Sequence, residues 1–172
     1  MSEPQLLMRR AELDDLPGMV LPDGYTVHRC ERVFAESEGA GIAQVLGEAF
    51  PGMAWSGQKV TDTFIGDAGC IATFYLRHGE TIVATATARR DPAFSGVGYV
   101  HWVGVSEAHR GNRLGYHVSL AVLHEFAQEG LTGAVLTTDD HRLAAIQTYR
   151  RLGFVPEFAH PSHEERWRRV SP

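Results

Sequence analysis

Residues Tyr99–Gly115 read YVHWVGVSEAHRGNRLG, and the rest of the chain is organised around this stretch. Its first part, up to Val105, is rich in valine and aromatic residues and predicts a buried strand. A basic turn with two glycines follows over 109–115, and a helical pattern then continues to about Gln128. The first amides of a helix have no partner within it, and the helix dipole adds partial positive charge there. The stretch therefore predicts an anion site.

The composition of the turn agrees with this interpretation. Gly111 and Gly115 lack side chains, so a phosphate can approach the backbone closely, and Arg110 and Arg113 supply positive charge around it. The turn is not a Walker loop, because no Gly-Lys-Ser/Thr follows, and its glycine spacing does not match the dinucleotide fingerprint. Many turns of this kind only connect two elements, so the function needs a second signal.

Two segments together resemble the GNAT superfamily of N-acetyltransferases. Its signature is Arg/Gln-x-x-Gly-x-Gly/Ala after an apolar-x-Val strand. Here Arg110 takes the first position and Gly115 the last. Arg113 replaces the middle glycine, so Asn112 and Arg113 must leave their amides available while their side chains point away. The second segment, 136–154 (LTTDDHRLAAIQTYRRLGF), is similar to the family's strand and following helix with Ala-Ile-x-x-Tyr-x-x-x-Gly-Phe.

The resemblance implies a mixed α/β fold of the GNAT type. Its sheet is central, mixed and mostly antiparallel, it splays apart in the middle, and helices cover both faces. Gly104, inside the central strand, predicts a bulge. Residues 1–23 are expected to form an N-terminal arm, as a helical turn or an extended segment, and 24–172 a single domain. The first strand is expected over 25–31.

Hydrophobic spacing predicts the remaining elements. Helices are expected over 34–50, 58–65 and 114–128, and another is expected to start with Asp139-Asp140 as caps and to end at Gly153. Strands are expected over 70–77, 80–90, 133–138, 154–158 and 165–170. The last of these strands is expected at an exposed edge of the sheet, which would permit a homodimer.

Composition narrows the class of protein. At 172 residues the chain is long enough to bury a substantial core, and a formal net charge of -5 argues against a general nucleic-acid surface. The two cysteines, Cys30 and Cys70, form no disulfide framework and are expected to be small buried residues. No stretch approaches the ~20 apolar residues of a membrane helix, and no signal peptide is recognised. We expect a cytoplasmic protein without membrane association. His117 and His124 lack the spacing of metal ligands, so no metal is expected.

The cofactor that the resemblance implies is acetyl-CoA, used as a co-substrate. Its pyrophosphate would lie on the backbone N–H groups of the loop, which comprises Arg110, Gly111, Asn112, Arg113, Leu114 and Gly115. Its pantetheine arm would pair with the backbone of Val103, Gly104 and Val105 as an added strand. Arg142 stands where the family usually has an asparagine and is either a cofactor contact or a surface residue.

Acyl transfer to an amine needs a neutral amine, a donor for the developing oxyanion and a proton for the leaving thiolate. Tyr149 matches the family tyrosine that acts as the acid. A main-chain N–H at Val103 or nearby would serve the oxyanion. Tyr99, His101, Val103 and Val105 are expected to share one face of the central strand. His101, with an unperturbed pKa of ~6.5, is the preferred base; the alternatives are a structural histidine and water as the proton carrier.

The sequence therefore predicts an N-acetyltransferase that moves an acetyl group from acetyl-CoA to a primary amine by direct attack in a ternary complex. The acceptor cannot be identified; Phe50, Met53 and Trp55 either contact it or belong to the core. Two alternatives stay open. One is a non-catalytic acyl-CoA-binding or sensing module, which the replacement of glycine by Arg113 would allow. The other is an unrelated phosphate-binding α/β protein.

Overall fold

The structure is a computed structural model that describes residues 3–170. The strands are β1 (Leu6–Arg10), β2 (Tyr25–Cys30), β3 (Cys70–His78), β4 (Thr81–Arg89), β5 (Val97–Val105), β6 (Gly133–Thr138) and β7 (Val155–Glu157). The helices are α1 (Glu36–Ala49), α2 (Gly57–Val60), α3 (Leu114–Gln128), α4 (Leu143–Arg151) and α5 (His163–Val170). A π-helical turn over 61–65 continues α2, and a 3₁₀ turn over 107–109 precedes α3.

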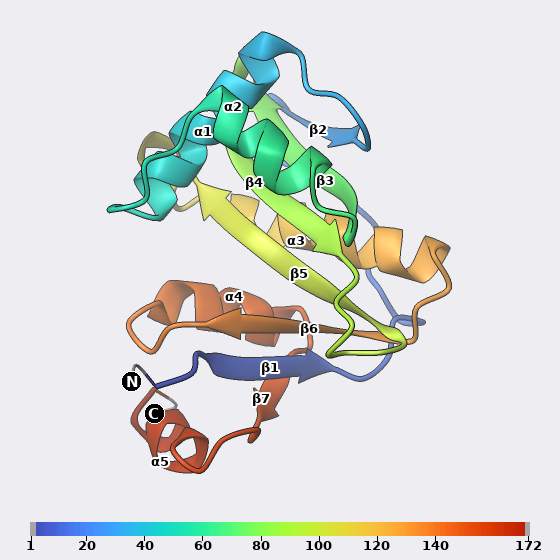
Figure 1. Ribbon diagram of the computed structural model, residues 1–172, viewed down its shortest axis with the longest axis vertical. Helices are drawn as coiled ribbons and strands as arrows, with labels where there is room; N and C mark the ends of the chain where they lie inside the picture. Colours follow the sequence, from blue (N-terminus) through green and yellow to red (C-terminus); the bar gives the residue numbers. More distant parts are fainter. Residues whose placement is uncertain (1–2, 171–172) are drawn as a thin grey trace.

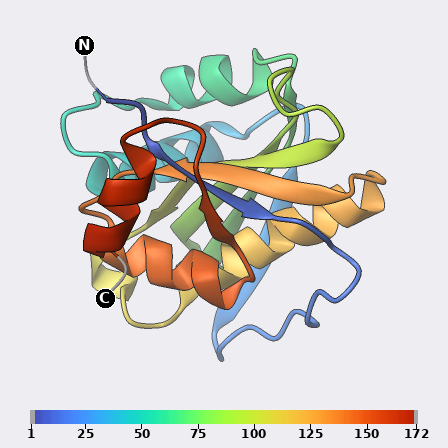
Figure 2. The ribbon, with the colours of Figure 1, turned by 90° about the horizontal axis from the view of Figure 1, so that it is seen from below.

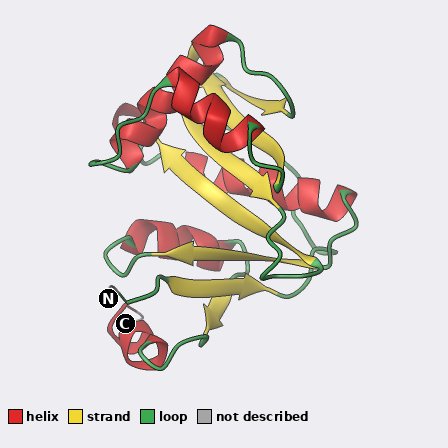
Figure 3. Ribbon diagram, in the orientation of Figure 1, coloured by secondary structure: helices red, strands yellow, loops and turns green. Residues whose placement is uncertain are grey.

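The seven strands form one sheet in the order β2-β3-β4-β5-β6-β1-β7 (Figure 1). Every neighbouring pair is antiparallel except β5 and β6, which run parallel. These two strands pair only where Val97–Tyr99 faces Gly133–Val135, and beyond this point they diverge (Figure 3). The mixed, mostly antiparallel and splayed sheet predicted from the sequence is therefore confirmed.

Helices cover both faces of the sheet, as expected (Figure 2). Helix α1 packs over β4 and β5 on one face, with α2 beside it, while α3 packs over β3, β4 and β5 on the other, with α4 beside it. The larger core cluster lies on the α3 side, and its fully buried side chains include Leu120, Leu123 and Phe126. No helix within residues 3–170 is long and apolar enough to cross a membrane.

The N-terminal segment differs from the expectation. The helical turn or extended arm expected there is wrong for residues 6–10, which form strand β1 inside the sheet, between β6 and β7. Leu6 and Met8 are fully buried, and Leu7 nearly so, on the opposite face. A strand buried on both faces is a continuous apolar run and not an alternating one, so period-two spacing did not reveal it.

The C-terminal segment also differs. The expected strand over 165–170 is instead helix α5, so the edge strand that would permit a homodimer does not exist there. The buried residues of α5 are His163, Trp167 and Val170, which recur at helical spacing. Ion pairs of the i,i+4 type, Glu164–Arg168 and Glu165–Arg169, lie on its exposed side.

Helix α4 starts later than predicted. Its N-cap residue is Arg142, without a side-chain cap, whereas Asp139 and Asp140 precede the helix. The Asp140 carboxylate instead accepts two hydrogen bonds from Arg166 of α5, at 3.0 and 2.5 Å. This pair fixes the C-terminal helix to the loop that leads into α4.

The bulge expected at Gly104 lies directly before it. In the pairing with β4, Thr85 faces Gly104 and Thr87 faces His101, so β5 carries one extra residue in between. Trp102 has a left-handed backbone with φ +51°, which is uncommon for a residue with a side chain. The extra residue reverses the alternation of side chains along the rest of the strand.

This reversal overturns one prediction about the strand. A Cβ at Gly98 would meet Phe126 of α3, and one at Gly104 would meet Ala49 of α1, so these even-numbered positions face opposite sides of the sheet. His101 stacks on Trp102 on the α1 side, with 4.7 Å between the ring centroids. The expectation that His101 shares a face with Val103 and Val105 is therefore wrong, because it assumed a regular strand.

Candidate active site

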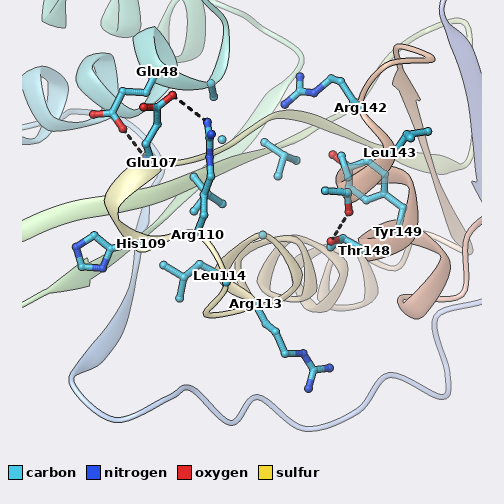
Figure 4. A pocket seen from close by; sticks show the side chains of 18 of the residues that line it. Glu48, Glu107, His109, Arg110, Arg113, Leu114, Arg142, Leu143, Thr148 and Tyr149 are labelled. Carbon is cyan, nitrogen blue, oxygen red and sulfur yellow. Dashed lines mark hydrogen bonds and ion pairs between the residues drawn. The ribbon is translucent and has the colours of Figure 1, made fainter.

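A cavity of about 590 Å³ lies where β5 and β6 separate (Figure 4). Its wall comes from the end of α1, the end of β5 with the loop that follows, and one side of α4 with the two residues before it. Most of the predicted site residues line it, namely Val103, Gly104, Val105, Arg110, Gly111, Arg113, Leu114, Gly115, Arg142 and Tyr149. Asn112 and His101 are not among the lining residues.

The loop between β5 and α3 has the backbone of an anion site. After the 3₁₀ turn, Gly111 (φ +87°) and Arg113 (φ +57°) adopt left-handed conformations, and α3 begins at Leu114. Nothing lies within 4 Å of a Cβ built on Gly111, so the space beside it is open. Because the first amides of α3 have no partner within the helix, they offer donors and partial positive charge to this space.

The side chains of Asn112 and Arg113 do not block the loop. The Asn112 amide donates a hydrogen bond to the carbonyl of His109 at 3.1 Å. The Arg113 side chain points away from the cavity (Figure 4), and its guanidinium lies over the Tyr116 ring, 5.1 Å from the centroid. Both side chains therefore point away from the open side of the loop, as the replacement of glycine by Arg113 required.

Two carboxylates line the α1 side of the cavity. Glu48 accepts a hydrogen bond from the backbone N–H of Glu107 at 2.7 Å, which is the main cause that lowers the pKa of its carboxyl. Glu107 in turn forms an ion pair with Arg110, at 3.4 Å. Sequence reasoning missed Glu48, because it lies at the end of a helix far from the loop in the chain. No local pattern marks it, because Gln44 lies one turn before it on the same face and makes this a polar side of the helix.

Tyr149 comes from α4, on the other side of the cavity. Its side chain is almost fully buried, and burial raises the pKa of the phenol to about 12, while the positive charge of Arg142 acts in the opposite direction. The phenol is therefore protonated at neutral pH and can donate a hydrogen bond. Its place on the wall agrees with the role that the sequence predicts for it.

His101 lies apart from this group. Its ring is half-buried on the α1 side, between Tyr99 and Trp102. Burial, with a smaller contribution from Arg89, lowers the pKa of His101 to about 4. The imidazole is neutral at pH 7, but it does not line the cavity that holds Tyr149. The bulge at Trp102 is the physical reason, because it turns the side chain of residue 101 to the face opposite Val103.

Comparison with known protein families shows which family the chain belongs to. A model described as the acetyltransferase (GNAT) family matches residues 40–154. The chain belongs to this family. The mycothiol acetyltransferase of Nocardia farcinica is 31% identical to it in an alignment of 163 residues that covers 87% of this chain and 52% of that protein. The chain spans about half the length of the curated relatives that it matches.

Solved structures show the same fold. A GCN5-related N-acetyltransferase from Sphaerobacter thermophilus superposes on this GNAT chain with a TM-score of 0.67 at 22% identity, covering 90% of this chain and 50% of that one. An aminoglycoside N-acetyltransferase solved in complex with CoA superposes with a TM-score of 0.65 at 15% identity, covering 82% of this chain and 96% of that one. Family membership excludes the unrelated phosphate-binding protein.

Aromatic rings surround the bulge of this GNAT sheet on its α1 side. Trp102 contacts Phe50 and Trp55 edge to face, at centroid distances of 5.2 and 4.9 Å. The Arg142 guanidinium lies over the Phe50 ring at 4.5 Å, so this contact joins the α1 side to the beginning of α4. Met53 is exposed. Phe50 and Trp55 thus both pack against Trp102. Neither of them lines the cavity.

Metal chemistry finds no support in the described part of the GNAT domain. Residues 3–170 contain no group of three His, Cys, Asp or Glu side chains that could hold a metal ion. Both cysteines are free, and burial raises the pKa of the Cys70 thiol to about 11, so that side chain is not a ready nucleophile.

Proposed function

We propose that the protein is an N-acetyltransferase that transfers the acetyl group of acetyl-CoA to a primary amine by direct attack in a ternary complex. The observation that carries the proposal is that one cavity joins the anion loop, the unpaired end of β5 and the Tyr149 side chain. The mycothiol acetyltransferase relative and the aminoglycoside N-acetyltransferase with bound CoA support the same chemistry.

The residues present fit acetyl-CoA. The open space beside Gly111 and the amides of Gly111–Gly115 would hold the pyrophosphate, whereas the Arg110 amide already donates to the Glu107 carbonyl, at 3.3 Å. Past Tyr99, the edge of β5 that faces β6 has no partner strand among residues 3–170, so the backbone of Val103–Val105 can pair with the amide groups of pantetheine. A hydrogen bond from the Ser106 N–H to the Val83 carbonyl, at 2.8 Å, holds this end of β5 on β4.

When bound, acetyl-CoA would supply an acetyl group activated as a thioester. A main-chain N–H at Val103 or nearby would stabilise the negative charge that develops on the acetyl oxygen. Tyr149 would donate its phenolic proton to the leaving sulfur, which it can do because its raised pKa keeps it protonated before the step. Arg142, close enough to act on the charge of the Tyr149 phenol, would stabilise both the phenolate and the thiolate.

The proton of the attacking amine does not pass to His101 in this proposal. His101 lies outside the cavity, and its lowered pKa makes it a weak base. The cavity is open to water, and its only nearby carboxylates within the described chain are Glu48 and Glu107. We therefore assign this proton to water in the cavity, with the Glu48 carboxylate as the charge that attracts the ammonium form of the acceptor.

The localisation, the acceptor side and the oligomeric state are proposed from the sequence. We propose a cytoplasmic protein, since its two cysteines are free and its net charge of -5 does not favour nucleic acid or an acidic membrane surface. Phe50, Met53 and Trp55 are proposed to form the acceptor side. Any homodimer would have to use another surface than the one over 165–170, which is helical.

The test is calorimetric titration with acetyl-CoA, CoA and ADP, followed by release of CoA thiol in the presence of a panel of primary amines. Micromolar affinity for both CoA compounds, weaker affinity for ADP and amine-dependent thiol release are expected. Binding without turnover on any amine would favour the non-catalytic acyl-CoA-binding alternative. No binding of acetyl-CoA or CoA would refute the proposal.

A further inference from the structure

Arg113 holds a backbone conformation that does not suit an arginine. Its φ of +57° lies in the left-handed region, where a side chain costs on the order of 1 kcal/mol relative to glycine. Glycine occupies the matching position of the motif that the sequence resembles. An arginine here costs backbone strain that a glycine would avoid, which points to a separate role for its side chain.

The charge of Arg113 is free to bind an anion. Three arginines line the cavity: Arg110 forms an ion pair with Glu107, and Arg142 lies over Phe50. Arg113 has no carboxylate partner within residues 3–170, and its guanidinium is held only over the Tyr116 ring. This contact uses one face of the guanidinium, while its N–H groups point outward at the edge and stay available.

The position of Arg113 relative to the proposed ligand indicates which anion it meets. In Figure 4 its side chain extends from the loop away from the cavity and away from Arg142. The pantetheine arm would run from the loop toward Tyr149 along β5, so the nucleotide end must lie on the outer side of the loop. The ribose of CoA carries its 3′-phosphate on the same ring as the pyrophosphate. The 3′-phosphate therefore cannot lie far from the loop.

We propose that Arg113 binds the 3′-phosphate of CoA and makes the enzyme selective for CoA over 3′-dephospho-CoA. The inference rests on the proposed function, because it assumes that CoA occupies the cavity. A guanidinium binds a doubly charged phosphate more strongly than an ammonium does, because its planar group can form two parallel N–H···O bonds. The left-handed backbone at Arg113 places the side chain outside the cavity, where this phosphate lies, and leaves the amides to the pyrophosphate.

The experiment measures the dissociation constants of CoA and of 3′-dephospho-CoA by calorimetry, for the wild type, Arg113→Gly and Arg151→Ala. Glycine suits φ +57°, so Arg113→Gly should fold at least as stably as the wild type, which thermal unfolding checks. Arg151 is an exposed arginine at the end of α4, away from the cavity, so its variant controls for the loss of one positive charge.

The wild type is expected to prefer CoA by about tenfold or more, the usual gain from a hydrogen bond between charged groups. Arg113→Gly should bring this ratio close to one by weakening CoA alone, with the affinity for 3′-dephospho-CoA unchanged. Arg151→Ala should keep the wild-type ratio. The inference is overturned by a wild type without preference, or by an Arg113→Gly variant that keeps it. If the wild type binds neither compound, the proposed function itself fails.

Discussion

The two halves of β5 have the same kind of sequence but different partners. Val97–Tyr99 pairs with β6, and Tyr99 also pairs with Arg89 of β4, whereas Gly104 and Val105 pair with β4 alone. The first half lies in the core, where Gly98 approaches Phe126 of α3. The second half lines the cavity. One strand thus belongs to the core at its beginning and leaves an unpaired edge beside the cavity at its end.

The bulge at Trp102 is what divides the two halves. It reverses the alternation of side chains, so Val103 and Val105 face the α3 side while His101 and Trp102 stay on the α1 side. The comparison teaches that a site can be built by removing a strand partner, because the freed backbone groups need new partners. The predictions below test the division, beginning with the largest expected effect.

The binding half should fail when its anion loop is given a negative charge. Gly115→Glu should weaken acetyl-CoA binding at least about 1,000-fold, or about 4 kcal/mol, because the carboxylate takes the amides from the pyrophosphate and repels it. A Cβ at Gly115 has ordinary contact with Val105, at 3.6 Å, so the fold should survive and Gly115→Ala is the matched control. Calorimetry and thermal unfolding measure the two effects. Gly111→Glu should lose binding too, but its φ of +87° adds backbone strain.

Equal affinity of Gly115→Glu and Gly115→Ala for acetyl-CoA would remove the loop from the binding site. The comparison between the halves of β5 would then lose its functional side.

The chemistry on the far wall of the cavity depends on one hydroxyl group. Tyr149→Phe should lower kcat by about 100-fold, the lower range for a general acid, with the affinity for acetyl-CoA close to normal. Tyr99→Phe is the matched control, because Tyr99 is also a buried tyrosine. Its hydroxyl shares a hydrogen bond with the Thr137 hydroxyl, at 2.7 Å, outside the cavity. Steady-state kinetics compare the variants. Unchanged turnover in Tyr149→Phe would exclude the tyrosine as the acid.

The structural half should respond to volume and not to charge. Gly98→Ala places a Cβ 2.4 Å from ring atoms of the buried Phe126, so we expect a loss of stability of about 2 kcal/mol from overpacking. The affinity of the folded protein for acetyl-CoA should not change. Gly104→Ala, in the binding half, meets Ala49 at 3.0 Å and should cost less stability. Urea unfolding ranks the two variants, and the reverse ranking would contradict the division.

The residue at the divide should give the smallest effect, a change in the pH dependence of stability. The pKa of His101 is about 4 in the folded protein, against ~6.5 when unfolded. The folded state therefore binds fewer protons between these values. The stability that the neutral ring contributes is complete above pH 6.5 and is lost as the pH falls toward 4. Replacement of His101 by glutamine removes this pH-dependent contribution to the free energy of unfolding.

Urea unfolding at pH 7.5 and pH 5.0 should show the difference. The wild type should lose about 1 kcal/mol more on acidification than His101→Gln does, less than the ~2 kcal/mol that the two pKa values alone would give, because solvent screens the half-buried ring. An equal loss in both proteins would show that His101 is not buried as a neutral ring.

Much of the fold could be predicted from the sequence because it follows from local patterns. Helices α1 and α3 and the hairpin of β3 and β4 lie within a residue or two of their expected positions. Helix α5 was within reach too, since His163, Trp167 and Val170 recur at helical spacing, but the short run of arginines resembled an exposed edge strand. Strand β1 was not, because its five residues have no periodicity and take their conformation from β6 and β7.

By itself the sequence determined the anion loop, since its glycines, its arginines and the start of α3 act through their neighbours in the chain. It also determined the place of Tyr149 on the inward face of α4. Only the tertiary structure decided what these parts can do together. It inserted β1, opened the sheet beyond Tyr99, turned His101 out of the cavity and brought Glu48 into it. Those outcomes depend on pairings between segments far apart in the chain, which no local pattern records.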